Sequence, residues 1–357
     1  MSVKYRNILG AFIAIYFFIS GIVLIKCSAV IMGESLAEKI VLLIKDTTSG
    51  VFAGWLSTAL LHSSGAFDSI VVALTSSGVM PMSLAVASII GAEFGTSVTP
   101  FLVSVLGHIR KRERLTVSFT ITMSHVIYNL LTLMLFYPTE LFFGLFTNIA
   151  WKGRSIFLKA TFLKTIPDLI ELITPWVKPL LIYIPAWSGL LIGAGMLVAA
   201  LAGVERYMTA TFSMPRSWNL LRATFMKPYR AFLAGFIFTI FVPSTTVMVS
   251  LLIPLAESGA ILADYYILPY ILGANIGTVF DVMIAAIATG NPISMGLWLV
   301  HFSINIIGAV IFFPLLKPFS ALVRRSAELI AASPKITLII VLILHGFPLI
   351  ILFTYIF

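Results

Sequence analysis

The sequence predicts an all-α, polytopic membrane protein with two inverted-topology repeats, each containing a re-entrant helical hairpin. Three observations lead to this fold class: charge is scarce, long apolar runs recur, and two parts of the chain match each other in order. Of the 357 residues 60% are hydrophobic, and the 23 Lys and Arg with the 14 Asp and Glu make up only 10%. Because a soluble protein of this length carries roughly ninety charged side chains, the composition excludes the soluble enzyme classes.

Seven apolar segments are long enough to cross a bilayer, since a helix needs about 20 residues to span the hydrocarbon core. These predicted spans are 8–32, 82–107, 115–137, 179–204, 265–289, 293–316 and 336–357. Two further segments, 51–79 and 231–262, are interrupted at mid-length by His62-Ser63-Ser64-Gly65 and Pro243-Ser244-Thr245-Thr246. Each half of these segments is too short to span. Broken backbone at membrane depth must be covered by protein or a watery cavity, so we predict two re-entrant hairpins.

The basic residues predict the orientation of the chain in the membrane. With seven crossings, the N-terminus and the loops 108–114, 205–230 and 317–335 lie on one side and carry fifteen of the 23 Lys and Arg. The positive-inside rule assigns that side to the cytoplasm. The sequence therefore predicts a multi-pass protein of the cell membrane with a cytoplasmic N-terminus.

Two halves of the chain match each other at a nearly constant spacing. Ala53-Gly54, Thr58, Ser63, Ser69 and Gly78 correspond, 181 positions later, to Ala234-Gly235, Thr239, Ser244, Ser250 and Gly259. Further along, Gly91-Ala92-Glu93-Phe94-Gly95-Thr96 faces Gly273-Ala274-Asn275-Ile276-Gly277-Thr278, and His125, Asn129 and Pro138 then match His301, Asn305 and Pro314. Each half crosses three times, so the two must insert with opposite orientation. Inverted repeats are typical of secondary transporters, whose sites lie between the repeats near the midplane.

The repeat divides the chain into four parts. We expect a first repeat at 1–138, an interfacial connector at 139–178, a second repeat at 179–316, and a cytoplasmic linker with the last transmembrane helix at 317–357. The mixed pattern of the connector predicts a helix that lies along the membrane surface.

Each break predicts an anion site, because a helix that begins inside the protein presents unpaired N–H groups and a positive dipole end. Hydroxyl groups add donors there, and glycine permits close approach of an oxyanion. The predicted substrate-binding residues are Ser63, Ser64, Gly65, Ser244, Thr245 and Thr246, with His62 as a further donor or a titratable group. The alternative is that these small residues only allow tight helix packing.

Acidic residues at membrane depth form a second candidate site, because a carboxylate in hydrocarbon is costly and usually serves an ion path. Asp68, Glu93 and Asp281 are such residues, and we expect them to bind a cation or relay protons. The alternative is a protonated or internally hydrogen-bonded acid. For His125 and His301 we favour a structural role, because each shares a helix face with an Asn four residues later.

Several kinds of function lack their sequence features. The single Cys27 excludes an intramolecular disulfide and a thiolate metal cage. We find no Walker loop, dinucleotide fingerprint or zinc signature, so we expect neither an enzyme nor ATP-driven transport. In a membrane protein the net charge of +9 indicates cytoplasmic loops and not nucleic-acid binding.

With the repeat in view, the chain resembles the type II sodium-dependent phosphate cotransporter family over about 50–138 and 231–316. Members carry Gln-Ser-Ser-Ser in each hairpin and then Gly-x-Asn-x-Gly-Thr, and here Ser63-Ser64 and Ser244-Thr245 stand at the first motif. The resemblance implies phosphate between the hairpin tips, and sodium bound by hydroxyls and carbonyls near Thr96, Asn275 and Thr278. The chain departs from the family at three kinds of position. His62 and Pro243 replace the glutamines, Gly65 and Thr246 replace the third serines, and Glu93 replaces the usual Asn.

The resulting hypothesis is a secondary active transporter that couples sodium to inorganic phosphate by alternating access, with the lipid bilayer as its surroundings. Two alternatives stay open. One is a proton-coupled carrier of phosphate or another anion, indicated by His62, Glu93 and Asp281. The other is a non-transporting membrane scaffold or regulator. The sequence also leaves open a homodimer.

Overall fold

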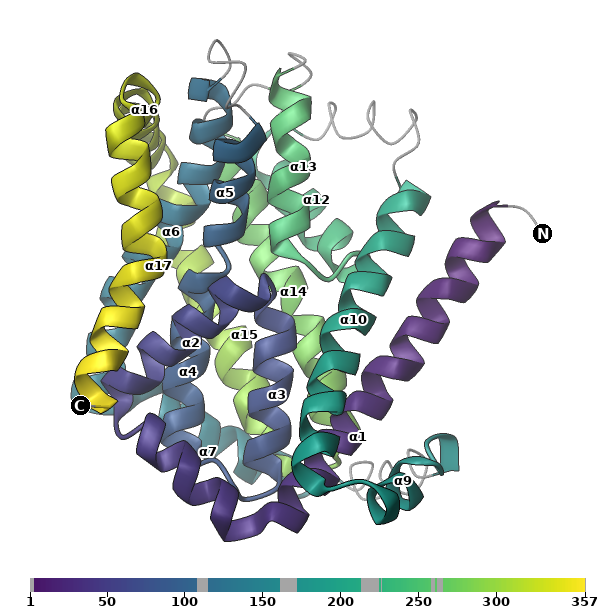
Figure 1. Cartoon of the computed structure of the whole chain (residues 1–357). Coiled ribbons are helices and arrows are strands. Elements are labelled where there is room, and N and C mark those ends of the chain that lie inside the picture. The colour runs from purple at the N-terminus through teal and green to yellow at the C-terminus, as the bar shows by residue number, and fades with distance from the viewer. Residues whose placement is uncertain are drawn as a thin grey trace.

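The computed structural model describes residues 3–107, 115–160, 172–212, 225, 227–257, 261 and 266–356. In this part of the chain the secondary structure is helical throughout, with helices joined by short turns (Figure 1). Six helical stretches are long and apolar enough to cross a membrane: Leu9–Met32, Met82–Val105, Leu115–Phe143, Ile267–Thr289, Pro292–Ala332 and Pro334–Tyr355. The prediction of an all-α, polytopic membrane protein agrees with this finding.

The first half of the chain holds the elements up to α7. They are α1 (Val3–Leu43), α2 (Thr47–Leu61), α3 (Ser64–Ser76), α4 (Met82–Gly95), α5 (Val98–Gly107), α6 (Leu115–Phe143) and α7 (Leu145–Phe157). The second half holds α9 (Val177–Tyr183), α10 (Ala186–Phe212), α12 (Pro228–Phe241), α13 (Thr245–Glu257), α14 (Ile267–Thr289), α15 (Pro292–Phe312), the 3₁₀ turn η2 (Phe313–Leu315), α16 (Leu316–Ala332) and α17 (Pro334–Ile356).

Two predicted spans are interrupted in the structure. The segment 179–204 is divided between α9 and α10, because Pro185 follows an extended Ile184 and cannot continue a helix. The helix α10 has 27 residues in all, and the apolar stretch within it whose residues are all described is Ala186–Ala200. The segment 82–107 is also divided, with α4 ending at Gly95 and α5 beginning at Val98.

Both interrupted segments, 51–79 and 231–262, fold as two short helices with the break where the sequence places it. The helix α2 is capped by Asp46, which accepts the N–H of Ser49, and it ends before His62. The helices α12 and α13 are separated by residues 242–244. In Figure 1 the pair α2–α3 lies in the lower part of the bundle and the pair α12–α13 in the upper part. Re-entry into a bilayer stays a prediction.

Glycines let α2 contact α4, and α12 contact α14, backbone to backbone. A Cβ atom at any of four glycines would overlap a carbonyl oxygen of the facing helix. The pairs are Gly54 with Ser88 and Gly91 with Val51 between α2 and α4, and Gly235 with Tyr270 and Gly273 with Phe232 between α12 and α14. These contacts occupy corresponding positions of the two halves.

The helices α1 and α10 cross at a pair of reciprocal glycines. A Cβ at Gly21 would lie 2.8 Å from the carbonyl oxygen of Gly193, and a Cβ at Gly193 would lie 2.9 Å from that of Gly21. Each helix therefore presents the same kind of surface to the other, as expected for elements related by a local twofold axis.

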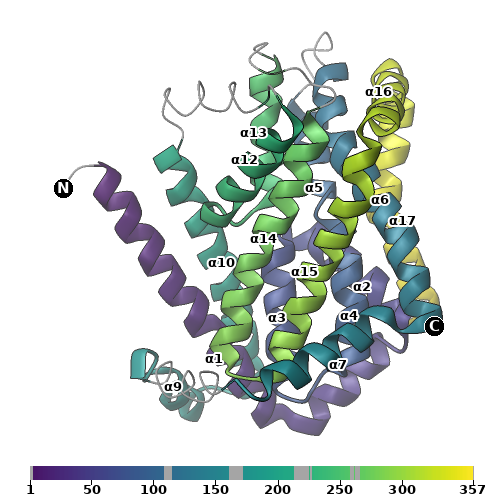
Figure 2. The ribbon, with the colours of Figure 1, turned by 180° about the vertical axis from the view of Figure 1, so that it is seen from behind.

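Two amphipathic helices lie at opposite ends of the bundle. The helix α7 packs on α15 at the lower end, and α16 packs on α6 at the upper end (Figures 1 and 2). Both views look nearly along the axis of α16, whereas α15 and α17 run vertically. We call α7 and α16 the rim helices. Each of them packs on a helix of the opposite half.

The predicted linker at 317–335 forms a helix, α16, over most of its length. Its buried residues recur every three or four positions, the spacing of a helix with one apolar face. They are Leu316, Phe319, Val323, Ala327 and Ile330. The charged residues between them make the segment resemble a loop in the sequence. Likewise α6 continues through Pro138 to Phe143, beyond the predicted end at 137.

Among the described residues the core consists of two buried apolar clusters, and each takes side chains from both halves. In one cluster Trp55 and Phe94 belong to the same packed group as Tyr270. In the other, Val72 and Ile89 belong with Val300. The halves therefore share their core and do not form separate domains.

Candidate functional site

Serine N-caps begin α3 and α13 at the two predicted breaks. Ser63 has extended backbone, and its Oγ accepts the N–H of Ala66 at 3.2 Å. In the second half the Oγ of Ser244 accepts the N–H of Val247, also at 3.2 Å. Each cap satisfies one of the four N–H groups that a helix start leaves without an intrahelical acceptor. The positive dipole end of each helix therefore lies at these residues, inside the bundle. We call 62–65 the first tip and 243–246 the second tip.

His62 makes the tight turn between α2 and α3. Its φ of 58° lies in the left-handed region, where it is the one non-glycine among the residues that the structure describes. The side chain is exposed, and Nδ1 lies 2.8 Å from Oγ1 of Thr99 on α5. The first tip is thus tied to the beginning of α5.

The second tip reaches the same region through the break between α4 and α5. Pro100 has no N–H to donate to the carbonyl oxygen four residues earlier, so the carbonyl of Thr96 is freed from the helical pattern. The Oγ1 of Thr246 donates to this oxygen at 3.4 Å. The α4–α5 junction is therefore the place where both tips meet the rest of the bundle.

Hydroxyl groups also attach the second tip to α14. Thr245 and Thr278 share a hydrogen bond between their side-chain hydroxyls. Thr278 Oγ1 in addition donates to the carbonyl oxygen of Ala274 at 3.0 Å, and all of these atoms are buried. Thr278, the threonine of the Gly-x-Asn-x-Gly-Thr motif, thus faces the second tip. This is the position expected if both contribute to one site.

Asp281 of α14 lies against the first turn of α3. A Cβ atom at Gly65 would overlap Oδ2 of Asp281, so only glycine leaves room for the carboxylate in this arrangement. Asp281 is 3% exposed. A carboxylate is favoured beside the N-terminus of a helix, where the dipole end is positive. The first tip therefore already faces one anionic group of the protein.

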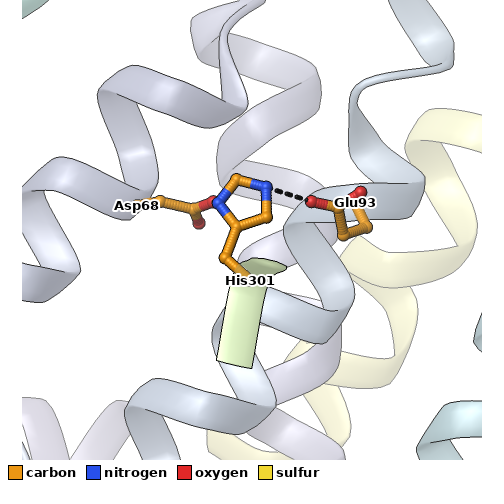
Figure 3. Close-up of side chains that lie close together, drawn as sticks. All are labelled: Asp68, Glu93 and His301. Atoms are coloured by element: carbon orange, nitrogen blue, oxygen red, sulfur yellow. Dashed lines mark ion pairs between the residues drawn. The ribbon is translucent and has the colours of Figure 1, made fainter. Parts of the chain in front are cut away.

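Asp68, Glu93 and His301 form a buried cluster that joins α3 and α4 to α15 (Figure 3). His301 Nε2 lies 2.6 Å from Oε1 of Glu93, and Nδ1 lies 3.4 Å from Oδ2 of Asp68. Asn305, one turn after His301, donates to the same oxygen of Glu93 at 3.3 Å. The imidazole therefore lies between two carboxylates from the opposite half.

A network of amides continues from this cluster toward α6 and α14. Asn129 Nδ2 donates to the backbone oxygen of Glu93 at 2.8 Å and lies 3.0 Å from Nε2 of His125. Asn275 Nδ2 donates to Oδ1 of Asn129 at 3.4 Å. The structural role favoured for His125 fits this arrangement.

The predicted site residues fall into three connected groups. The first-tip residues and Asp281 form one group. Thr245, Thr246, Thr96 and Thr278 form another, beside the cap Ser244. Asp68 and Glu93 form the third, to which Asn275 is joined through Asn129. Sequence reasoning missed three contributors: Thr99, Pro100 and His301, the last of which it expected to be structural. The feature that could have pointed to His301 is that Asp68 and Glu93 have no basic residue nearby in their own sequence, so a partner had to come from elsewhere.

Comparison with known proteins places this arrangement in a family. The model of the Na⁺/Pi-cotransporter family matches residues 17–152 and 196–325, which is well over half of the chain. The chain belongs to the Na⁺/Pi-cotransporter family. The matched ranges contain both pairs of short helices, the α4–α5 junction and the buried cluster, so the prediction of this family from the sequence is confirmed.

Curated relatives of this Na⁺/Pi-cotransporter family member carry matching names. Sodium-dependent phosphate transport protein 2A of Rattus norvegicus is 23% identical over 378 residues, covering 80% of this chain and 58% of that protein. Sodium-dependent phosphate transport protein 2B of Homo sapiens is 33% identical over 128 residues, covering 35% of this chain and 17% of that protein. The Bos taurus 2B protein is 32% identical over 141 residues, 39% of this chain and 19% of that protein. The chain thus spans less than two thirds of the length of these relatives. It matches no solved structure.

Proposed function

We propose that the protein is a secondary active transporter that couples sodium to inorganic phosphate and works by alternating access. The observation that carries the proposal is the convergence of both tips on the α4–α5 junction, where His62 contacts Thr99 and Thr246 contacts Thr96. Two helix N-termini that face one region give an oxyanion donors from both halves. The family membership and the names of the relatives support phosphate as that oxyanion and sodium as the coupling ion.

Phosphate would lie between the tips of α3 and α13. The donors proposed for it are the first-turn N–H groups with the hydroxyl groups of Ser63, Ser64, Ser244, Thr245 and Thr246, the backbone at Gly65, and the ring of His62. Asp281 beside Gly65 would repel a bare anion, so a cation held between them would make binding of phosphate favourable. This arrangement gives a physical reason for coupling the two ions.

Sodium would use oxygen ligands, because alkali ions in transporters are held by carbonyl, hydroxyl and carboxylate oxygens. The proposed set consists of the carboxylates of Asp68, Glu93 and Asp281, the hydroxyl groups of Thr96 and Thr278, and the amide of Asn275. The freed carbonyl of Thr96 adds an oxygen at the junction. These groups come from both halves, so a movement between the halves would assemble or open the site.

Alternating access would follow from an inverted arrangement of the halves, which their equivalent contacts support. Equivalent glycine contacts hold α2 on α4 and α12 on α14, and α1 crosses α10 at reciprocal glycines. If each pair of short helices enters from its own side of the membrane, rocking one half against the other opens the tips alternately to the two sides.

Uptake of labelled phosphate into proteoliposomes, with sodium and proton gradients imposed separately, tests the proposal. We expect uptake under a sodium gradient and none under a proton gradient alone. Uptake under a proton gradient alone would show that protons, and not sodium, are the coupling ion. The position of His301 between two carboxylates favours this alternative. No uptake under either gradient, together with no phosphate binding, would favour a scaffold or regulator.

A further inference from the structure

Asp68 and His301 face each other in the buried cluster with polar atoms that lack hydrogen-bond partners. Within the described part of the chain, neither oxygen of Asp68 nor Nδ1 of His301 makes a hydrogen bond. The two side chains are 0% and 1% exposed, so water does not supply the missing partners from the surface. Unsatisfied polar atoms at this depth are costly, and a native protein normally supplies a partner or a bound ion.

The other side of the imidazole ring is already held. Glu93 Oε1 lies 2.6 Å from Nε2, and Asn305 donates to that oxygen, so both the ring and the carboxylate are oriented. A carboxylate that holds one ring nitrogen fixes the tautomer and turns the lone pair of the other nitrogen toward a ligand. Here the other nitrogen is Nδ1, which points to Asp68 (Figure 3).

The separation of Nδ1 and Oδ2 suits a metal ion. These atoms are 3.4 Å apart, and two ligands bound about 2.0–2.1 Å from a tetrahedral ion are separated by roughly 3.3–3.4 Å. One ligand atom each from Asp68, Glu93 and His301 lies within 4.8 Å of the others. The arrangement therefore resembles a histidine–carboxylate metal site with a second carboxylate behind the histidine.

The donor types decide which ion fits. An imidazole nitrogen suits zinc, copper, nickel and iron, whereas magnesium and calcium take oxygen ligands. Asp281 lies against Gly65, one helical turn before Asp68, and adds a third acidic side chain to this part of the bundle. Three acids around one imidazole favour a divalent ion over a monovalent one, since attraction grows with the charge of the ion.

We infer that Asp68 and His301 bind a divalent transition-metal ion of the zinc class, with Glu93 as the positioning residue on the far ring nitrogen. Asp68 belongs to α3 and His301 to α15, so the bound ion would tie the first tip to the second half of the chain. The inference goes beyond sodium–phosphate coupling and does not rest on it, because it concerns binding of the metal alone. Asp68 and Glu93 also belong to the proposed sodium set, so a divalent ion bound here would take the place of sodium at these two carboxylates.

Metal titration of the purified full-length protein, stripped with a chelator, tests the inference. We expect one Co²⁺ per chain, with the visible absorption of a low-symmetry site and displacement by Zn²⁺. His301→Gln and Asp68→Asn should each weaken binding at least 100-fold. Glu93→Gln should weaken it by about 10- to 100-fold with the cobalt spectrum retained, because it removes only the outer partner.

His345→Gln is the matched control, since His345 lies on α17 and contacts the backbone of Val341. It should bind cobalt like the wild type. Absence of cobalt or zinc binding in the wild type, or equal binding by Asp68→Asn and the wild type, would overturn the inference. Asp68→Asn keeps the shape of the side chain, so it decides the question even if His301→Gln does not fold. Phosphate uptake is not part of the readout, so failure here leaves the transport proposal untouched.

Discussion

Gly65 determines how closely Asp281 can approach the first tip. The carboxylate occupies the volume that any other side chain at position 65 would need. A side chain at position 65 would therefore force the carboxylate or the start of α3 to move.

Replacing that glycine should therefore be costly. Gly65→Ala must displace Asp281 or the start of α3, and overpacking of this kind costs about 1–3 kcal/mol. We expect a lower thermal unfolding midpoint in detergent and weaker phosphate binding. Gly195→Ala on α10 is the control, because nothing lies within 4 Å of its added Cβ. Equal stability of both variants would show that the contact with Asp281 does not constrain position 65.

The two capping serines offer a test of the anion site itself. Each cap contributes about 0.5–2 kcal/mol, so Ser63→Ala with Ser244→Ala should lower stability modestly and leave the fold intact. If the hydroxyl groups also bind phosphate, the double variant should lose phosphate affinity in a direct binding assay. Ser155→Ala on the exposed face of α7 is the control. Unchanged phosphate affinity in the double variant would move the substrate site elsewhere.

Among the elements, the interrupted helix α4–α5 is the clearest asymmetry between the halves. Its counterpart α14 is continuous from Ile267 to Thr289. The difference follows from Pro100, which leaves the carbonyl of Thr96 without an intrahelical donor and so makes it available to Thr246. Because of this one proline, the junction has a free carbonyl oxygen that would accept a backbone hydrogen bond in a continuous helix.

Pro100→Ala should return the Thr96 carbonyl to the helix. The new N–H can donate to it, and Thr246 then loses its acceptor. If this oxygen contributes to sodium binding, the variant should need more sodium for half-maximal phosphate uptake. Pro138→Ala is the matched control, because α6 already continues through that proline. An unchanged sodium dependence in Pro100→Ala would remove the Thr96 carbonyl from the cation site.

The helix α16 can be tested with two adjacent residues. Ile330 is 4% exposed and Leu329 is 57% exposed. Ile330→Ala should destabilise the protein by about 2–5 kcal/mol through the cavity it leaves, whereas Leu329→Ala should change stability by no more than about 0.5 kcal/mol. Thermal unfolding of the two variants measures the difference. Similar effects of both would mean that α16 does not pack against α6 through this face.

For the molecule as a whole, the central prediction is that the halves insert with opposite orientation. Lys152 on α7 and Arg325 on α16 are both exposed, and the rim helices lie at opposite ends of the bundle. In a Cys27→Ser background, Lys152→Cys should react with an impermeant maleimide added outside intact cells. Arg325→Cys should react only after the membrane is opened. Labelling of both from the same side would contradict the inverted arrangement.

The fold could be predicted from the sequence wherever a local pattern determines it. The breaks at Ser63 and Ser244 follow from polar residues inside apolar runs. The repeat matches the glycines of the two halves, although it does not say which helices they bring together. The helix α16 was missed because its charges hide a regular apolar spacing. The pairing of Asp68 and Glu93 with His301 could not be predicted, because it depends on how α15 packs on the other half, and no local pattern encodes that packing.

The crossed rim helices have a consequence for how the chain is made. The helix α7 finds its partner α15 only after nearly the whole second half has been synthesised, and α6 waits still longer for α16. The surfaces of α7 and α6 that these partners cover therefore face lipid or water until the partners arrive. Each half completes its packing only against the other. We therefore expect the two halves to fold together, and neither to be stable by itself.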